Sequence, residues 1–166
     1  QLIIEEGKNH KLSHCGAHAM DTMRMESGFL HWGHDISPEE NQYESGLNFT
    51  ISYKKETNFI GKESLLKIKD KKQEKRFIML SLRDNNPGHP LLLHEEPIYL
   101  NNKIIGKTTS GNYSFNYKKN LAFGYIYSMY KNEDLKKMNL YIEVAKKKYL
   151  AMVETVPLKD KQARYL

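Results

Sequence analysis

Five histidines fall in two short stretches near the start of the chain, where they could bind a metal ion. His10, His14 and His18 are spaced one helical turn apart, and His31 and His34 form an HxxH pair. A zinc site needs three or four converging ligands, and catalytic pairs are usually accompanied by the Glu of an HExxH motif. Because that Glu is absent, we predict no metal site. The row of three is expected to be solvated, and the pair to make local hydrogen bonds.

An aromatic loop, residues 29–36, is predicted directly after a helix. Phe29, His31, Trp32 and His34 fall within six residues. Rings of this kind at a helix end can form the wall of a site for a flat, partly polar ligand. Equally, Phe29 and Trp32 could attach the helix to a neighbouring domain. Composition and spacing leave both alternatives open.

Charged side chains on the predicted helix could serve as acid–base groups, but their spacing favours ion pairs. Asp21 and Arg24 lie three residues apart and can pair along the helix, and Thr22 and Glu26 can share a hydrogen bond. Such pairs are usually structural. Cys15, the single cysteine, is predicted to be a small buried residue and not a nucleophile. We predict no catalytic residue in this chain.

The helix that carries these groups is predicted to run from an N-cap at Ser13 to Gly28, which would follow its last turn. Upstream, residues 2–7 are predicted to be the tail of another helix, ended by a glycine. The packing face of the longer helix is predicted from small and Met residues at helical spacing. These residues are Gly16, Ala19, Met20, Met23 and Ser27.

The rest of the chain is predicted to contain one short helix and many short strands. Residues 37–40 favour a turn, 47–53 a half-buried strand, and 61–68 a short helix capped by Thr57 or Asn58. A charged linker follows at 70–75. Strands are then predicted at 76–82, 97–100, 104–106, 108–114, 121–127, 140–144 and 149–156, with a hairpin turn at 101–103. Strands at such spacing predict a closed or nearly closed barrel.

Composition excludes several classes of protein. The chain of 166 residues carries a net charge of +6, but only four of its 26 basic residues are Arg, and the lysines are dispersed. Proteins that bind bases and phosphates favour Arg at their contacts, so we expect no nucleic-acid partner. No apolar run approaches the ~20 residues of a membrane helix, and Gln1 does not open a signal peptide. A single cysteine fits a reducing compartment, so a cytoplasmic location is expected.

Several motifs resemble the carboxy-terminal part of the glycine-cleavage T-protein (aminomethyltransferase) superfamily. They include residues 19–28 (AMDTMRMESG), 31–36 (HWGHDI), 44–47 (ESGL), 59–65 (FIGKESL), 96–99 (EPIY), 105–111 (IGKTTSG) and 121–125 (LAFGY). Pro157, Asp160 and Arg164 resemble the family's closing motif, with Lys161 in place of its second Pro. The sequence of residues 24–36 is most similar to the folate-binding halves of dimethylglycine dehydrogenase and sarcosine dehydrogenase.

The resemblance implies a function in one-carbon transfer. Such modules receive a one-carbon unit from a glycine-type amine and pass it to tetrahydrofolate. By this resemblance, Met20, Phe29, His31 and Trp32 would lie at the rim of the folate pocket. Met20 stands where classical T-proteins carry Arg, which favours the dehydrogenase subgroup. The family's catalytic Asp, and the Tyr and Glu that hold the pterin, would lie upstream of Gln1, so the isolated chain is predicted to be inactive.

We therefore predict an α+β protein in two parts. Residues 1–72 would be the closing portion of a truncated folate-binding T-protein-like domain, and residues 73–166 an antiparallel β-barrel. The expected partners are folate and a missing amino-terminal half or flavin-containing subunit, with FAD bound only if an upstream oxidase domain exists. Apolar surface left by truncation favours a homo-oligomer. The alternatives are a non-catalytic β-barrel interaction module and a folate-binding relative that acts in RNA modification.

Overall fold

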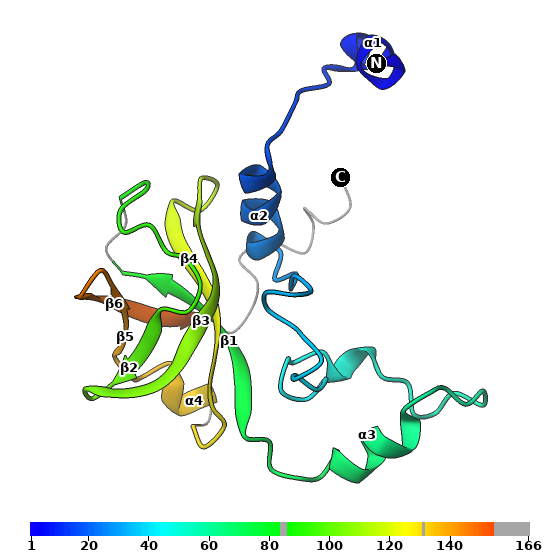
Figure 1. Cartoon of the computed structure of the whole chain (residues 1–166), viewed down its shortest axis with the longest axis vertical. Coiled ribbons are helices and arrows are strands. Elements are labelled where there is room, and N and C mark those ends of the chain that lie inside the picture. Colours follow the sequence, from blue (N-terminus) through cyan, green and yellow to red (C-terminus); the bar gives the residue numbers. More distant parts are fainter. Residues whose placement is uncertain (84–85, 131, 155–166) are drawn as a thin grey trace.

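The computed structural model of the chain describes residues 1–83, 86–130 and 132–154. Its main body is a closed barrel of six antiparallel strands (Figure 1). The strands are β1 (Lys75–Leu82), β2 (Pro97–Leu100), β3 (Lys103–Ser114), β4 (Lys119–Tyr127), β5 (Leu140–Val144) and β6 (Lys147–Glu154). They follow one another around the barrel in the order β1-β4-β3-β2-β5-β6, and β6 pairs back with β1. The α+β class and the predicted barrel are thereby confirmed.

Local turn chemistry sets the register of the barrel. Asn101 and Asn102 both have positive φ, 48° and 63°, as a two-residue hairpin turn between β2 and β3 requires. The two strands predicted at 104–106 and 108–114 are one strand, β3, which is interrupted by a bulge. The register of β3 against β4 shifts between Thr108 and Ser110, so Thr109 has no partner across the ladder.

Two separate apolar clusters hold the molecule together. The first fills the inside of the barrel and consists of Ile78, Leu80, Leu82, Leu92, Ile98, Ile105, Ala122, Ile126, Leu135, Leu140, Ile142 and Ala151. The second joins helix α2 (Ala17–Glu26) to the outer surface of β1 and β4. Its buried members are Met25, Met79, Leu121 and Phe123, with Phe77 packed against them. The barrel therefore has its own core, and α2 covers part of its outside.

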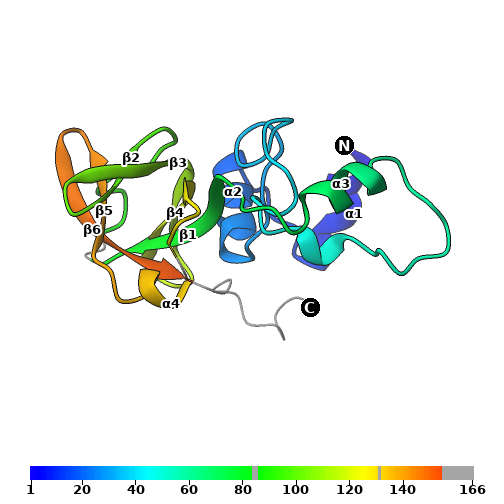
Figure 2. The ribbon, with the colours of Figure 1, turned by 90° about the horizontal axis from the view of Figure 1, so that it is seen from below.

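The first 74 residues lie beside the barrel and contain little regular structure. Besides α2 they form α1 (Leu2–Gly7), the 3-10 helices η1 (Lys8–His10) and η2 (Asn48–Thr50), and α3 (Lys62–Ile68). Figures 1 and 2 show α1 and α3 away from the barrel, with α2 next to β3 and β4. A further short helix, α4 (Asn132–Leu135), connects β4 to β5. None of the helices in the described ranges is long and apolar enough to span a membrane.

Three predictions about these first residues are wrong. Residues 47–53 form no strand: Asn48–Thr50 is a 3-10 turn in which the Thr50 hydroxyl donates to the carbonyl of Leu47 at 2.7 Å. Helix α2 begins at Ala17 with Gly16 as its N-cap, not Ser13, and α3 has Gly61 as its N-cap, not Thr57 or Asn58. Both caps are set by backbone conformation, since neither has a side-chain capping bond.

The predicted packing face of α2 is wrong for Met20 and Met23 but right for Ser27, which is buried, and the predicted burial of Cys15 is wrong. Met20 and Met23 are 60% and 58% exposed, and the buried side chains of α2 are Thr22, Met25 and Glu26. The helix meets the barrel through hydrogen bonds as much as through apolar contact, so apolar spacing pointed to the wrong face. Cys15 is exposed because it lies in the extended connection before α2, where residues 11–18 are all exposed.

Other predictions hold. The helix ending at Gly7, the end of α2 before Gly28 (φ +73°) and the short helix over residues 62–68 are confirmed. So is the turn at residues 37–40, where the amide of Glu40 donates to the carbonyl of Ser37. The remaining strands are confirmed within two residues at each end, except that the last two residues of the strand predicted at 149–156 lie outside the described residues. The closing motif of Pro157, Asp160 and Arg164 lies outside the described residues.

Candidate functional site

The aromatic loop has an ordered backbone that follows directly from α2. Gly28 ends the helix, and Gly33 (φ +88°) allows a tight turn within the loop. The amide of Gly33 donates to the carbonyl of Ile36 at 2.7 Å, and that of Asp35 donates to the carbonyl of His31 at 2.8 Å. The loop is therefore closed on itself, and its side chains project from a defined backbone.

Asp35 fastens this loop to the rest of the molecule. Its carboxylate is fully buried and accepts hydrogen bonds from Arg24 Nη1 at 2.7 Å and from the amide of His31 at 2.9 Å, both on Oδ2. Its other oxygen, Oδ1, accepts from the hydroxyls of Thr109 at 2.6 Å and Ser110 at 2.7 Å. One carboxylate thus connects the loop, helix α2 and strand β3.

Arg24 is the cationic partner of this network. Its Nε pairs with Asp21 at 2.7 Å, which confirms the predicted ion pair, and its Nη2 donates to Ser110 at 2.9 Å. The guanidinium also lies over the ring of Phe123, 5.9 Å from its centroid. Arg24 is therefore held on three sides by other side chains.

A second buried carboxylate, Glu26, fixes the end of α2. It accepts hydrogen bonds from the hydroxyl of Ser114 and from Asn116 Nδ2 at 2.8 Å. The hydroxyl of Thr22 donates to the carbonyl of Tyr113 at 3.3 Å. The hydrogen bond predicted between Thr22 and Glu26 is therefore wrong, because both side chains point toward β3 instead of along the helix.

Neighbouring groups have shifted pKa values. Burial, together with the nearby carboxylates of Glu40, Asp35 and Glu44, raises the pKa of Tyr125. Its hydroxyl therefore stays protonated and donates to the backbone carbonyl of Asp35 at 2.9 Å. Partial burial opposes ionisation of Glu40, but hydrogen bonds from Lys75 and Ser37 outweigh it and lower its pKa. The lowered pKa of Glu40 corresponds to a stabilising interaction between its carboxylate and β1, through Lys75.

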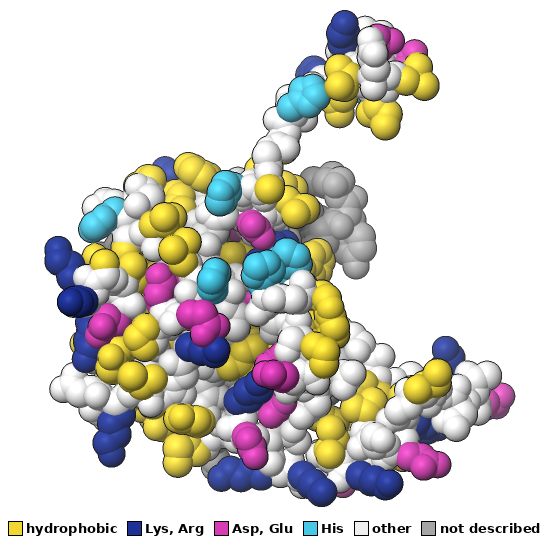
Figure 3. Space-filling view, in the orientation of Figure 1, with side chains coloured by type: hydrophobic (Ala, Val, Ile, Leu, Met, Phe, Trp, Pro, Cys, Tyr) yellow, Lys and Arg dark blue, Asp and Glu magenta, His cyan; other side chains and the backbone are white. Residues whose placement is uncertain are grey.

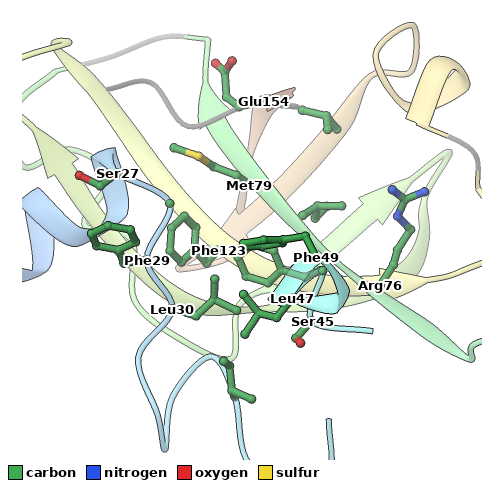
Figure 4. Close-up of a pocket in the computed structure, with 16 residues that line it drawn as sticks. Ser27, Phe29, Leu30, Ser45, Leu47, Phe49, Arg76, Met79, Phe123 and Glu154 are labelled. Carbon is green, nitrogen blue, oxygen red and sulfur yellow. The ribbon is translucent and has the colours of Figure 1, made fainter. Parts of the chain in front are cut away.

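A large apolar cavity lies next to the loop, on the outer surface of the barrel (Figure 4). Its volume is about 710 Å³, within the range of small-molecule sites. It is lined by Ser27, Gly28, Phe29, Leu30, Ile36, Ser45, Gly46, Leu47, Phe49, Arg76, Phe77, Ile78, Met79, Phe123, Val153 and Glu154. Figure 4 labels three aromatic rings around this space, Phe29, Phe49 and Phe123, together with the side chains of Leu30 and Leu47. Rings and aliphatic groups make up most of this surface.

The four residues predicted to contact a ligand do not all meet at this cavity. Phe29 lines it and is 61% exposed. Trp32 and Met20, at 67% and 60% exposure, and the exposed His31 are not among its lining residues. Phe29 and Trp32 do not attach the helix to the barrel either, since Met25 and Phe123 make that contact.

Three of the histidines, His31, His34 and His94, lie near one another. The rings of His31 and His34 lie 4.6 Å apart between centroids, and His94 lies 6.4 Å from His34. Figure 3 shows histidines grouped on this face next to acidic side chains. Within residues 1–83, 86–130 and 132–154, no group of three or more His, Cys, Asp or Glu side chains could hold a metal ion.

Sequence reasoning missed Asp35, Thr109 and Ser110 as residues of the site. The hydrogen bonds between them join positions 74 and 75 residues apart, which no local pattern reveals. One signal was available: residues 108–110 are three consecutive hydroxyl residues in a predicted strand segment, and hydroxyls need polar partners when they are covered.

Comparisons with known proteins agree with this architecture. A family model described as "GCVT N-terminal domain" matches residues 1–55, and one described as "Glycine cleavage T-protein C-terminal barrel domain" matches residues 75–160. The crystal structure of the glycine cleavage system aminomethyltransferase T from Bartonella henselae has a TM-score of 0.80 at 20% identity, over 95% of this chain and 43% of that one. This similarity shows a shared fold.

Sequence relatives extend the comparison. A 4-methylaminobutanoate oxidase (formaldehyde-forming) from Paenarthrobacter nicotinovorans is 40% identical over 67% of this chain. Human mitochondrial dimethylglycine dehydrogenase is 34% identical over 75% of it. The chain spans only 13% and 14% of the lengths of these two proteins. Because the barrel model covers more than half of the chain, the chain belongs to the glycine cleavage T-protein family.

Proposed function

We propose that this chain is the closing part of a folate-dependent one-carbon transfer module. The module would pass a one-carbon unit from a glycine-type amine to tetrahydrofolate. The observation that carries the proposal is the aromatic loop, where Phe29 and Trp32 are held out toward solvent from a backbone that buried hydrogen bonds fix. Large aromatic side chains exposed on an ordered loop beside a cavity are typical of a binding site.

The residues present suit a reduced folate. When bound, tetrahydrofolate supplies the nitrogens that accept the one-carbon unit. The flat pterin needs aromatic faces, which Phe29 and Trp32 offer, and polar partners at its edge, which the imidazole of His31 can supply. Met20 would contribute an adaptable apolar contact at the rim. The cavity beside Phe29 has the volume for a ligand of this size.

The other parts of the proposal concern the complete protein. We place the boundary between the folate-binding portion and the barrel near residues 72 and 73, within the charged segment that precedes β1. The general base of the module would come from another part of the family fold. The sequence contains no Gly-x-Gly-x-x-Gly, so FAD would require another domain or subunit.

Calorimetric titration with a reduced folate tests the proposal. Native protein is expected to release or absorb heat, and Trp32→Ala and Phe29→Ala are each expected to weaken binding about tenfold or more, as the loss of one stacking partner implies. Phe115→Ala is the matched control, because Phe115 is 73% exposed in the turn after β3 and does not line the cavity. Its affinity should equal that of native protein. Absence of binding by native protein would refute the proposal.

A further inference from the structure

We propose that Asp35 is the positioning residue of the aromatic loop. It would hold the backbone at His31 so that Phe29 and Trp32 face the ligand, without touching the ligand itself. The identity of the ligand rests on the proposed function, whereas the role of Asp35 in ordering the loop does not. It is carried by the contacts of one carboxylate, which joins elements that no apolar cluster brings together.

The Asp35 carboxylate is fully used by the protein. An ionised carboxylate offers about four lone-pair sites. Arg24 and the amide of His31 occupy Oδ2, and the two hydroxyls of Thr109 and Ser110 occupy Oδ1. Its side chain has no exposed surface. Because no acceptor site remains and no solvent reaches it, Asp35 acts only through the loop that it holds.

The bulge in β3 makes this arrangement geometrically feasible. In a regular strand, adjacent side chains point to opposite faces of the sheet. Here the register shift between Thr108 and Ser110 leaves Thr109 unpaired, and the hydroxyls of Thr109 and Ser110 reach the same oxygen at 2.6 and 2.7 Å. The bulge therefore lets two adjacent hydroxyls of β3 bind the carboxylate that holds the loop. Bulges commonly redirect side chains in this way near functional sites.

Asp35→Asn isolates this role. The amide loses the negative charge that pairs with Arg24 and keeps only one oxygen. In one orientation its NH2 group would face the N–H donors of Arg24 and His31, and in the other it would require the Thr109 and Ser110 hydroxyls to turn and accept. The variant is expected to exchange the backbone amides of residues 31–36 at least tenfold faster than native protein, while those of β4 stay protected. Trp32, the single tryptophan, reports the same change as faster local motion in time-resolved fluorescence anisotropy. Affinity for reduced folate should fall about tenfold.

Glu26→Gln is the matched control. Glu26 is also a buried carboxylate that joins α2 to β3, at 3% exposure, but its partners Ser114 and Asn116 do not contact the loop. Its substitution should leave the exchange of residues 31–36 and the Trp32 anisotropy unchanged. Equal effects of Glu26→Gln and Asp35→Asn on the loop would overturn the proposal, because general loosening of α2 would then suffice.

Thr109→Val provides a milder second variant if Asp35→Asn does not fold. It removes one of the four hydrogen bonds and keeps the ion pair with Arg24. Exchange of residues 31–36 is expected to rise severalfold, and native exchange rates in this variant would contradict the proposal. If the loop loosens as expected but native protein binds no folate, the positioning role stands and the proposed function fails.

Discussion

Phe123→Ala tests whether the small outer cluster, and not the loop, holds α2 on the barrel. Phe123 has no exposed surface and packs with Met25 and Met79. Its ring meets that of Phe77 edge to face, with centroids 5.1 Å apart and an angle of 72°. Removal of a buried Phe side chain costs about 3–5 kcal/mol, of which an aromatic pair accounts for about 0.5–1.5 kcal/mol.

The structure places the expected loss near the lower end of this range. Phe123 borders the cavity of about 710 Å³, so its removal enlarges an open space that water can enter. We therefore expect a loss of about 3 kcal/mol in the free energy of unfolding. With a urea dependence of about 1–3 kcal/mol per molar, the midpoint of unfolding would fall by about 1–3 M.

Urea unfolding, followed by Trp32 fluorescence and by circular dichroism of the barrel, measures this loss. Phe49→Ala is the control, because Phe49 lines the same cavity but is 79% exposed. Its cost should stay within about 0.5 kcal/mol. A loss below about 1 kcal/mol for Phe123→Ala, or equal losses for the two variants, would refute the reasoning that burial in the outer cluster secures α2.

Three further predictions concern pH, backbone space and turn geometry. The pKa of Glu40 is lowered in the folded state, so its carboxylate stabilises the fold at any pH above its pKa in the unfolded chain. This stabilisation is lost as the pH falls through the folded-state pKa. Glu40→Gln should therefore lose less unfolding free energy than native protein on titration from pH 6 to 3. Gly111→Ala should lower the unfolding free energy by more than about 2 kcal/mol, since a Cβ there would lie 2.6 Å from the backbone carbon of Leu92; no change in thermal melting would contradict this. Asn102→Val should cost about 1–2 kcal/mol and Asn102→Gly little or nothing, because residue 102 has φ +63°; equal melting temperatures for the two variants would show that the turn does not constrain the hairpin.

The barrel could be predicted because its signals are local. Alternating residues give strands, and the pair Asn101 and Asn102 tolerates the positive φ that a tight hairpin needs. Closure follows from the number and spacing of short strands. The bulge at Thr109 could not be predicted, since it depends on contacts with a loop more than 70 residues earlier.

The first 74 residues were predicted less well for a physical reason. Alternation in residues 47–53 resembled a strand, but a strand also needs a partner ladder, and Asn48–Thr50 closes a local turn instead. Apolar spacing on α2 selected Met20 and Met23, whereas the buried face is fixed by the hydrogen bonds of Thr22 and Glu26. Where polar contacts decide packing, hydrophobic periodicity alone misplaces the buried face.

The candidate site also contains some residues that the sequence predicts and others that only the fold reveals. Phe29 and Trp32 stood out in the sequence because large aromatic residues in a loop are conspicuous, and the structure places both at its surface. The groups that hold the loop are a carboxylate and two hydroxyls, which are common residue types without a spacing rule. Residue type identified the exposed part of the site, and only the fold identified its support.

The position of the inner cluster makes the core of the barrel independent of the residues that precede β1. All of its members lie between Ile78 and Ala151, and the partly buried side chains packed against it also lie beyond residue 77. Among the described residues, no side chain from residues 1–74 belongs to this interior. Substitutions in the aromatic loop therefore leave that interior undisturbed, so this part of the molecule can diversify while the barrel remains the same.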